Sequence, residues 1–211
     1  KESKKSWKQF GKTSIKRIDY SESMSFLEQR VDDVINDKKD ELLWVLEHNP
    51  VFTSGISSKD EDILDKSIKV VKSNRGGRIT YHGPGQKVVY FVLNLNKREK
   101  DIRKLLNNLE SCIIDILKEY KVNSYPDKKN IGIWVGDLNK QKKIAAIGIK
   151  VKKWIAYHGF SLNISNNLDL YNKIVPCGIK NKGIINLKEI GISNFNNIEK
   201  VIVNKFLNIF L

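Results

Sequence analysis

Three stretches of the chain carry apolar residues at helical spacing. Residues 23–36 contain Leu27, Val31, Val34 and Ile35, behind serines at positions 21, 23 and 25. Residues 101–120 carry the longest apolar stripe, and residues 196–210 carry a similar one. Side chains three or four positions apart share one face of a helix. We therefore predict helices over 23–36, 101–120 and 196–210, the first capped by its serines.

Five shorter runs have the apolar, β-branched character of strands. They are Leu42–Leu46, Lys87–Leu95, Ile131–Val135, Lys143–Val151 and Phe160–Ile164. The polar stretch 136–142 predicts a hairpin between the third and fourth runs. Strands mixed with helices predict an α/β (α+β) fold, a mixed β-sheet with flanking helices. Without a repeat or a Pro/Gly-rich linker, residues 1–211 are expected to form a single domain.

The composition narrows the class of protein. Two cysteines in 211 residues make no disulfide framework, and no Cys/His cluster has the spacing of zinc ligands. No apolar run is long enough to cross a bilayer, and no apolar stretch follows the basic start as in a secretory signal. We expect a cytoplasmic protein with free thiols, no metal and no membrane span.

The formal net charge is +14. Such a charge favours an acidic partner, which can be a nucleic acid, an anionic membrane or an acidic protein. The chain is also rich in Lys, Ile and Asn, and its lysines are spread along the whole sequence. Codon bias of an AT-rich genome explains that pattern equally well, so both explanations stay open.

A glycine-rich segment, residues 75–86, does not have the pattern of core or surface. It holds four glycines in the run Arg-Gly-Gly-Arg-Ile-Thr-Tyr-His-Gly-Pro-Gly-Gln. Glycines let the backbone take positive φ and approach a ligand, so the N–H groups of the segment can bind a carbonyl or a phosphate. The alternative is a pair of tight turns that flank a strand.

Two further residues are candidates for chemistry. Lys143 opens an apolar strand, where it is either partly desolvated or a solvated strand end. Cys177 lies between a proline and a glycine, hence in a turn where a thiol can react if its thiolate is stabilised. Cys112 lies on the apolar side of the predicted helix 101–120 and is expected to be inert core. The three histidines, His48, His82 and His158, all lie in segments rich in Gly, Pro or aromatic residues, which is mild support for a site.

Together these segments resemble the lipoyl(octanoyl) transferase family, the octanoyl-acyl-carrier-protein:protein octanoyltransferases of lipoate biosynthesis. The resemblance covers about residues 42–190 and rests on segments 47–53, 75–86, 143–148, 157–163 and 175–179. Phe160 and Ser161 stand where the family often has Leu-Ala. The resemblance implies a fold shared with biotin protein ligases and lipoate ligases.

The same resemblance implies roles for individual residues. Cys177 matches the nucleophile and Lys143 the lysine paired with it, while His48, His82 and His158 are expected near the site. The segments that match the acyl site contain Arg75, Gly76, Gly77, Arg78, Ile79, Thr80, Tyr81, His82, Ala146, Ile147, Gly148, Gly159, Phe160 and Ser161. Ala145, Ala146 and Gly148 are small enough to leave room for an acyl chain.

The implied reaction carries an octanoyl group as a thioester on Cys177 and needs no cofactor. The donor is octanoyl-acyl carrier protein, and the acceptors are lysines of lipoyl domains of 2-oxoacid dehydrogenase complexes and of the glycine cleavage H protein. The Lys143 ammonium favours the thiolate, and the neutral amine can later act as a base. Backbone N–H groups of the glycine-rich segment or of the Cys177 turn are candidates for an oxyanion hole. A basic enzyme would attract acidic carrier proteins.

Two alternatives remain. An ATP-dependent lipoate–protein ligase would share the fold and the glycine-rich segment, but it needs no nucleophilic cysteine. A basic nucleic-acid-binding module would need clustered lysines beside aromatic residues. Residues Lys150–Lys153 next to Trp154 are the one weak candidate for such a cluster, and we expect no nucleic-acid partner.

Overall fold

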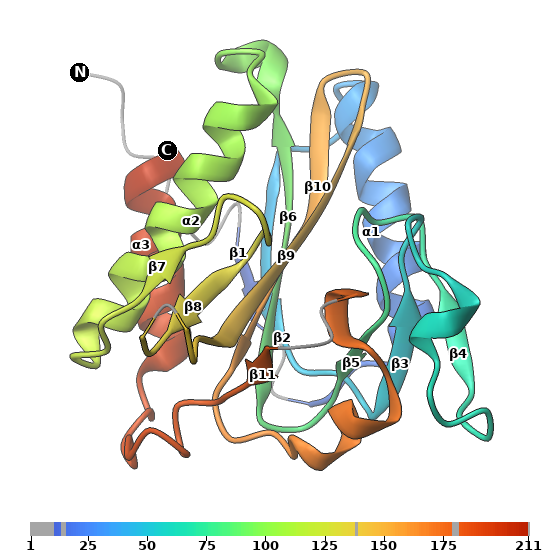
Figure 1. Cartoon of the computed structure of the whole chain (residues 1–211). Helices are drawn as coiled ribbons and strands as arrows, with labels where there is room; N and C mark the ends of the chain where they lie inside the picture. The colour runs from blue at the N-terminus through green and yellow to red at the C-terminus, as the bar shows by residue number, and fades with distance from the viewer. Residues whose placement is uncertain (1–10, 14–15, 138, 179–181, 211) are drawn as a thin grey trace.

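The computed structural model describes residues 11–13, 16–137, 139–178 and 182–210. Its centre is an eight-stranded sheet in the order β1-β2-β6-β10-β9-β8-β7, with β11 paired to β9 (Figure 1). The strands of this sheet are β1 (Gly11–Thr13), β2 (Leu42–Leu46), β6 (Gln86–Asn94), β7 (Tyr125–Pro126), β8 (Ile133–Val135), β9 (Lys142–Lys152), β10 (Ile155–Asn163) and β11 (Gly183–Ile184). β1 pairs with β2, and β11 with β9, in parallel; the other pairs are antiparallel, so the predicted mixed sheet is confirmed.

The predicted strands lie in this sheet, with one large shift in their bounds. β8 and β9 form the predicted antiparallel hairpin. β10 begins at Ile155, five residues before the predicted start. Every residue of β10 is buried, so the strand lacks the alternation of polar and apolar positions that marks a strand in sequence. His158 also has a φ of 69° within it. The pairing of β10 with β6 and β9 nevertheless continues in register through this residue.

Helices cover both faces of the sheet. α1 (Tyr20–Ile35) packs on one face, and α2 (Ile102–Glu119) and α3 (Ile198–Phe210) pack on the other (Figure 1). All three helices were predicted, but the cap of α1 was not. Asp19 accepts hydrogen bonds from the N–H groups of Ser21 and Glu22, so an aspartate takes the role expected of the serines. The helix therefore starts three residues earlier than predicted.

Two separate cores follow from these layers. The α2/α3 side buries Leu109, Ile113 and Phe206 against the sheet. The α1 side buries Leu27 and Trp44. The central strands β2, β6 and β10 contribute to both cores because successive side chains point to opposite faces.

A second sheet lies beside the first and carries the glycine-rich segment; one of its strands, Thr80–His82, is the strand flanked by turns that was the alternative for that segment. It has the order β4-β3-β5, with β3 (Val51–Ser54), β4 (Val70–Lys72) and β5 (Thr80–His82). Short 3-10 turns complete the chain: η2 (Asp60–Asp62), η3 (Leu95–Lys97), η4 (Asp169–Lys173) and η5 (Pro176–Gly178). Strands of three or four residues are too short to show a period in sequence.

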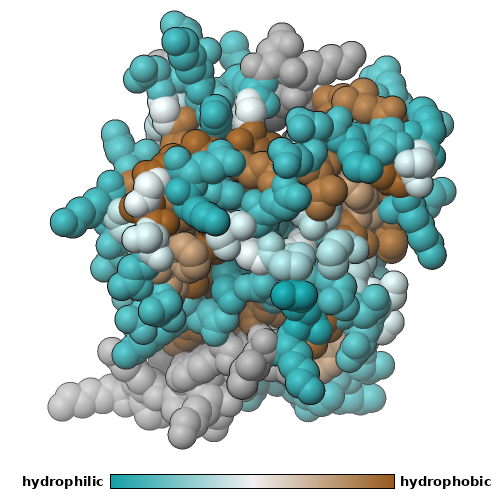
Figure 2. All heavy atoms as spheres, turned by 90° about the horizontal axis from the view of Figure 1, so that it is seen from below, coloured by the Kyte–Doolittle hydropathy of each residue, from teal (hydrophilic) through white to brown (hydrophobic). Residues whose placement is uncertain are grey.

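The surface seen from below is mostly hydrophilic, with hydrophobic side chains visible between the polar ones (Figure 2). Among the described residues, no helix combines the length and the apolar character that crossing a membrane requires.

Candidate active site

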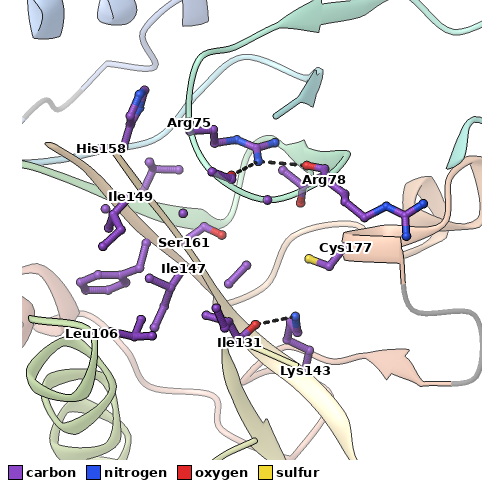
Figure 3. A pocket seen from close by; sticks show the side chains of 18 of the residues that line it. Arg75, Arg78, Leu106, Ile131, Lys143, Ile147, Ile149, His158, Ser161 and Cys177 are labelled. Carbon is purple, nitrogen blue, oxygen red and sulfur yellow. Dashed lines mark hydrogen bonds between the residues drawn. The ribbon is translucent and has the colours of Figure 1, made fainter. Parts of the chain in front are cut away.

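A cavity of about 430 Å³ lies between the glycine-rich segment and strands β9 and β10 (Figure 3). That volume is within the range of small-molecule sites. Most of the predicted site residues line it: Lys143, Cys177, Arg75, Gly76, Gly77, Arg78, Thr80, His82, Ala146, Ile147, Gly148, His158, Gly159, Phe160 and Ser161. Segments far apart in sequence therefore converge on one space. We call it the site cavity.

Lys143 is a buried lysine at one end of the site cavity. Only 3% of the residue is exposed, so the alternative of a solvated strand end is wrong. Its Nζ donates a hydrogen bond to the carbonyl oxygen of Ile131 at 2.9 Å and lies 4.8 Å from the centre of the Trp134 ring. Gly132 makes room for this lysine, since an added Cβ would lie 3.1 Å from Lys143 Cε. Backbone and ring contacts thus hold the amine without a carboxylate.

Cys177 is held in a strained turn, and Gly178 is required beside it. Cys177 has φ 55° and Gly178 has φ 72°, both left-handed. A Cβ at Gly178 would lie 2.0 Å from Nη1 of Arg78, whose side chain passes over this glycine. Arg78 in turn makes a two-pronged ion pair with Asp62, through Nε at 2.8 Å and Nη2 at 2.5 Å. Asp62 also accepts, through its backbone oxygen, the N–H of Val175 at 2.7 Å. This network positions the Cys177 turn.

Lys143 and Cys177 face the same space. Both line the site cavity and also a small adjoining hollow, which they share with Thr80, Ser161 and Ala146. Figure 3 shows the sulfur of Cys177 and the Lys143 side chain on neighbouring walls. Cys177 is partly exposed. Cys112 is fully buried in the α2/α3 core, as predicted, and burial raises the pKa of its thiol to about 12. The accessible thiol is therefore the one beside the buried amine.

Several of the backbone N–H groups considered for an oxyanion hole already donate hydrogen bonds within the protein. The N–H of Cys177 donates to Ile79 O at 3.0 Å, and the N–H of Gly178 donates to Val175 O at 3.0 Å. In the glycine-rich segment, the N–H of Gly76 donates to Ile149 O at 3.3 Å. The Cys177 turn is thus unsuited to the role that we considered for it. The N–H groups of residues 77 and 78 remain as candidates.

Arg75 organises the glycine-rich segment from inside. Its Nη1 donates to the backbone oxygens of Gly76 and Arg78, and its Nη2 donates to the backbone oxygen and hydroxyl of Thr53, all within 3.0 Å. The backbone approaches β9 so closely that a Cβ at Gly148 would lie 3.1 Å from Gly76 O. The segment is therefore a fixed wall of the site cavity and is fastened to both sheets.

The histidines near the site cavity are uncharged at neutral pH. Burial is the main cause that lowers the pKa of His82 and of His158 to about 3, and burial also lowers the pKa of His48. His82 donates from Nδ1 to Gln86 Oε1 at 2.7 Å. His158 donates from Nε2 to Asn74 Oδ1 at 2.7 Å. Each amide thereby fixes one tautomer and leaves the other ring nitrogen as an acceptor.

Three predicted residues do not line the site cavity. Thr80 and His82 point into it from β5, so Ile79 and Tyr81 point the opposite way and pack in a third core under the small sheet. His48 lies behind the wall. Its ring centre is 5.8 Å from that of His82, and its Nε2 accepts a hydrogen bond from the Tyr90 hydroxyl at 2.8 Å.

The structure adds wall residues that the sequence did not indicate. They are Tyr20, Val88, Tyr90, Ile102, Leu106, Lys129, Asn130, Ile131 and Ile149. Tyr90 belongs to a strand that looked like uniform core, and nothing in its pattern marked it. Ile102 and Ile131 are 46% and 52% exposed, so this end of the site cavity opens to solvent. A solvent-exposed apolar pair of this kind leaves no signal in a periodic pattern.

The lysine cluster beside Trp154 has local partners. Lys152 forms an ion pair with Asp32 at 2.8 Å, and Lys150 Nζ lies 5.9 Å from the centre of the Tyr157 ring. Lys100 lies over the Trp154 ring at 5.8 Å. Two of the three lysines in this cluster therefore have partners within the protein.

Comparisons with known proteins show the family of this chain and its fold. The family model "Lipoyl protein ligase A/B catalytic domain" matches residues 19–207. An "Octanoyltransferase" of Ehrlichia chaffeensis is 45% identical over 197 residues, which cover 92% of each chain. Solved structures show the fold: a bipartite lipoate protein ligase from Thermoplasma acidophilum aligns with a TM-score of 0.71 at 14% identity, over 95% of this chain and 83% of that one. A biotin acetyl coenzyme A carboxylase synthetase from Helicobacter pylori aligns with a TM-score of 0.52 at 13% identity, over 95% and 74%. The expected likeness to lipoate and biotin ligases is confirmed.

Proposed function

This chain belongs to the lipoyl protein ligase A/B catalytic-domain family, and we propose that it is an octanoyltransferase that carries the octanoyl group as a thioester on Cys177. The observation that supports this proposal most directly is that Cys177 and the buried Lys143 line the same cavity. The first product of lipoate assembly would be an octanoyl amide on a lysine of a lipoyl domain.

In the first step the Cys177 thiolate attacks the thioester carbonyl of octanoyl-acyl carrier protein. A C–S bond to Cys177 forms, the C–S bond to the carrier breaks, and the carrier leaves as a thiol after it takes up a proton from the Lys143 ammonium. One thioester replaces another, so the step is close to balanced in free energy. The Lys143 ammonium would stabilise the thiolate by its charge. One of its three N–H groups donates to the carbonyl oxygen of Ile131 and the Trp134 ring lies beside it, so other N–H groups are free to face the sulfur.

In the second step the neutral amine of the acceptor lysine attacks the Cys177 thioester. A C–N bond forms, the sulfur leaves as a thiolate, and the amine loses a proton. Lys143, after giving up its own proton, is the base nearest the reacting carbon in this scheme. The N–H groups of residues 77 and 78 are our candidates to stabilise the oxyanion in both steps.

The partners follow from the same scheme. The acceptors would be lipoyl domains of 2-oxoacid dehydrogenase complexes and the glycine cleavage H protein. The open end of the site cavity, at Ile102 and Ile131, would receive the carrier's acyl arm and later the acceptor lysine. The exposed Lys129 at this end would favour acidic partners.

The alternative is ATP-dependent ligation of lipoate. The fold allows it, because a lipoate protein ligase aligns at a TM-score of 0.71. That likeness is at 14% identity and shows fold alone, whereas the relative at 45% identity is an octanoyltransferase. A thiol paired with a buried amine also has no use in forming an adenylate.

The test is transfer to an unmodified lipoyl domain, followed by intact mass of that domain. We expect octanoylation from octanoyl-acyl carrier protein without ATP, and none from free octanoate with ATP. Cys177→Ala should lose transfer, while Cys112→Ala, the matched change at the buried thiol, should keep it. Modification that requires ATP and survives Cys177→Ala would establish the ligase instead.

A further inference from the structure

Two lysines lie against one buried indole ring beside the site cavity. The Nζ atoms of Lys143 and Lys182 are each 4.8 Å from the centre of the Trp134 ring, and only 1% of Trp134 is exposed. The two nitrogens are therefore separated by no more than twice that distance. Two ammonium groups so close to each other, beside a buried ring, repel each other unless a carboxylate neutralises one of them.

Asp127 supplies such a carboxylate to Lys182. Its Oδ2 accepts a hydrogen bond from Lys182 Nζ at 2.8 Å. The same oxygen accepts from Gln141 Nε2 at 2.9 Å and from Asn130 Nδ2 at 2.8 Å. The side chains of Asp127 and Lys182 are 16% and 27% exposed, so water screens the pair only in part. The bond from Lys182 is the main cause that holds the pKa of Asp127 below its usual range, and the pair is therefore ionised and neutral as a whole.

Asp127 also shapes the loop that holds Lys143. Its backbone oxygen accepts the N–H of Asn130 at 3.1 Å, which closes a turn before β8. The next two carbonyl groups along this turn hold the lysine and its ring. The oxygen of Asn130 accepts from Trp134 Nε1 at 3.0 Å, and the oxygen of Ile131 accepts from Lys143 Nζ at 2.9 Å (Figure 3). Asp127 therefore reaches Lys143 through the loop as well as through charge.

The proposed reaction uses Lys143 in both of its protonation states. The lysine gives a proton to the departing carrier in the first step and takes one from the acceptor amine in the second. A lone Lys182 ammonium beside the same ring would drive this proton off too readily. A lone Asp127 carboxylate would hold the proton too tightly. The neutral pair does neither.

We propose that Asp127 and Lys182 are positioning residues, which set how firmly Lys143 holds its proton by forming a neutral ion pair beside the Trp134 ring. The inference rests on the proposed function, because that function gives Lys143 its acid–base role. Neither residue of the pair lines the site cavity or the small hollow, so both act through Lys143 and do not touch the reacting atoms.

Other titratable groups share the site cavity with Lys143. They are Arg75, Arg78, Lys129, Cys177, His82 and His158. Both histidines are uncharged at neutral pH, because burial lowers their pKa to about 3. The phenols of Tyr20 and Tyr90 line the site cavity, and that of Tyr171 lines the small hollow. All these groups are the same in the variants below, so a shift that follows only changes of Asp127 or Lys182 belongs to the pair.

The test measures how the rate of Cys177 acylation by octanoyl-pantetheine depends on pH. In the proposed scheme this rate falls at high pH, where Lys143 has lost the proton that the departing thiolate takes up. Asp127→Asn leaves Lys182 as an unpaired cation, so the fall should move to lower pH. At an effective dielectric constant of about 20, a unit charge at this separation moves it by about one pH unit. Lys182→Met leaves the carboxylate unpaired and should move the fall to higher pH, and the double variant should restore the wild-type position.

Asp65→Asn is the matched control. Asp65 also forms an ion pair with a lysine, Lys173 at 2.9 Å, and it also accepts the backbone N–H two positions further on, as Asp127 does. Neither Asp65 nor Lys173 lines the site cavity, so the pH profile of the control should match that of the wild type. With an active wild type, a fall that moves in the same direction in Asp127→Asn and Lys182→Met, or that moves in neither, would overturn the inference and leave the proposed function intact.

A second readout does not depend on activity. The chain has four tryptophans, so protein that carries 5-fluorotryptophan gives four ¹⁹F signals, and Trp134→Phe identifies the one from Trp134. This signal should shift as Lys143 loses its proton, and Lys143→Met should abolish that step. We expect the midpoint of the step at lower pH in Asp127→Asn and at higher pH in Lys182→Met. One midpoint common to the wild type and both variants would overturn the inference, even in a protein that forms no thioester.

Discussion

Gly178→Ala tests whether the Arg78–Asp62 pair positions the nucleophile. The substitution adds one carbon at φ 72° and 2.0 Å from Arg78 Nη1, a distance that no real contact tolerates. The left-handed backbone alone costs a residue with a Cβ about 1–2 kcal/mol. Displacing Arg78 also separates it from Asp62, whose side chain is only 2% exposed. Breaking a buried ion pair costs about 3–5 kcal/mol, and we take the lower end because the Arg78 side chain is 24% exposed.

The chain offers a matched control for the backbone cost. Gly191 has φ 88°, and a Cβ there meets no atom within 4 Å. Gly191→Ala should therefore lower the free energy of unfolding by about 1 kcal/mol. Gly178→Ala should lower it by about 4–5 kcal/mol, the sum of the backbone cost and the lower end of the ion-pair cost. The assays are urea unfolding and the rate at which Cys177 gains an acyl group from a small octanoyl thioester. Equal stability losses in the two variants, together with unchanged acylation, would refute the role of the pair.

Three further predictions concern charge. Lys143→Met should slow the acylation of Cys177 by about 100-fold, because a positioned proton-transfer group contributes on that order. Stopped-flow kinetics of acyl transfer measures this rate. A rate within twofold of the wild type would exclude a role of Lys143 in acylation. The free energy of unfolding should fall as the pH drops from about 6.5 towards 3. In the folded protein His82 and His158 have a pKa of about 3, whereas in the unfolded chain these histidines take up protons at a pKa of about 6.5. Each histidine therefore adds up to about 1.4 kcal/mol per pH unit to this loss. His158→Asn should flatten that slope in urea unfolding at several pH values, and an identical slope would contradict it. Lys129→Glu should raise the KM for octanoyl-acyl carrier protein but not the KM for octanoyl-pantetheine, which lacks the acidic carrier. The control is Lys200→Glu at an exposed position on α3, which should change neither KM. Equal effects of Lys129→Glu on both donors would contradict a role of Lys129 in attracting the carrier.

The layers of the fold could be predicted because long amphipathic helices and buried strands leave a periodic signal. The stripe of residues 101–120 became α2, and Leu42–Leu46 became β2 without a change of bounds. β3 and β4 were missed because three or four residues show no period, whereas β5 is the strand that the alternative for residues 75–86 placed between two turns. β10 was found only in part, because all of its residues are buried and its first half shows no alternation.

The sequence indicated those site residues whose type limits the backbone conformation. It did not indicate those that reach the site only through tertiary packing. Glycines at 76 and 178 are needed for close approach and for a left-handed turn, and both stood out in sequence. Tyr90 lay in a strand that looked like ordinary core and Tyr20 lay before the predicted first helix, yet both line the site cavity. The burial of Lys143 depends on Trp134 and on the carbonyl of Ile131, contacts that exist only after β8 pairs with β9.

The most direct test of the account is the intact mass of the protein after incubation with octanoyl-acyl carrier protein in the absence of ATP and of any acceptor. The account predicts that the wild type and Cys112→Ala each gain one octanoyl group that hydroxylamine removes, and that Cys177→Ala gains none. An unmodified wild type with reduced thiols and fresh donor, or an octanoyl group that persists in Cys177→Ala, would contradict it.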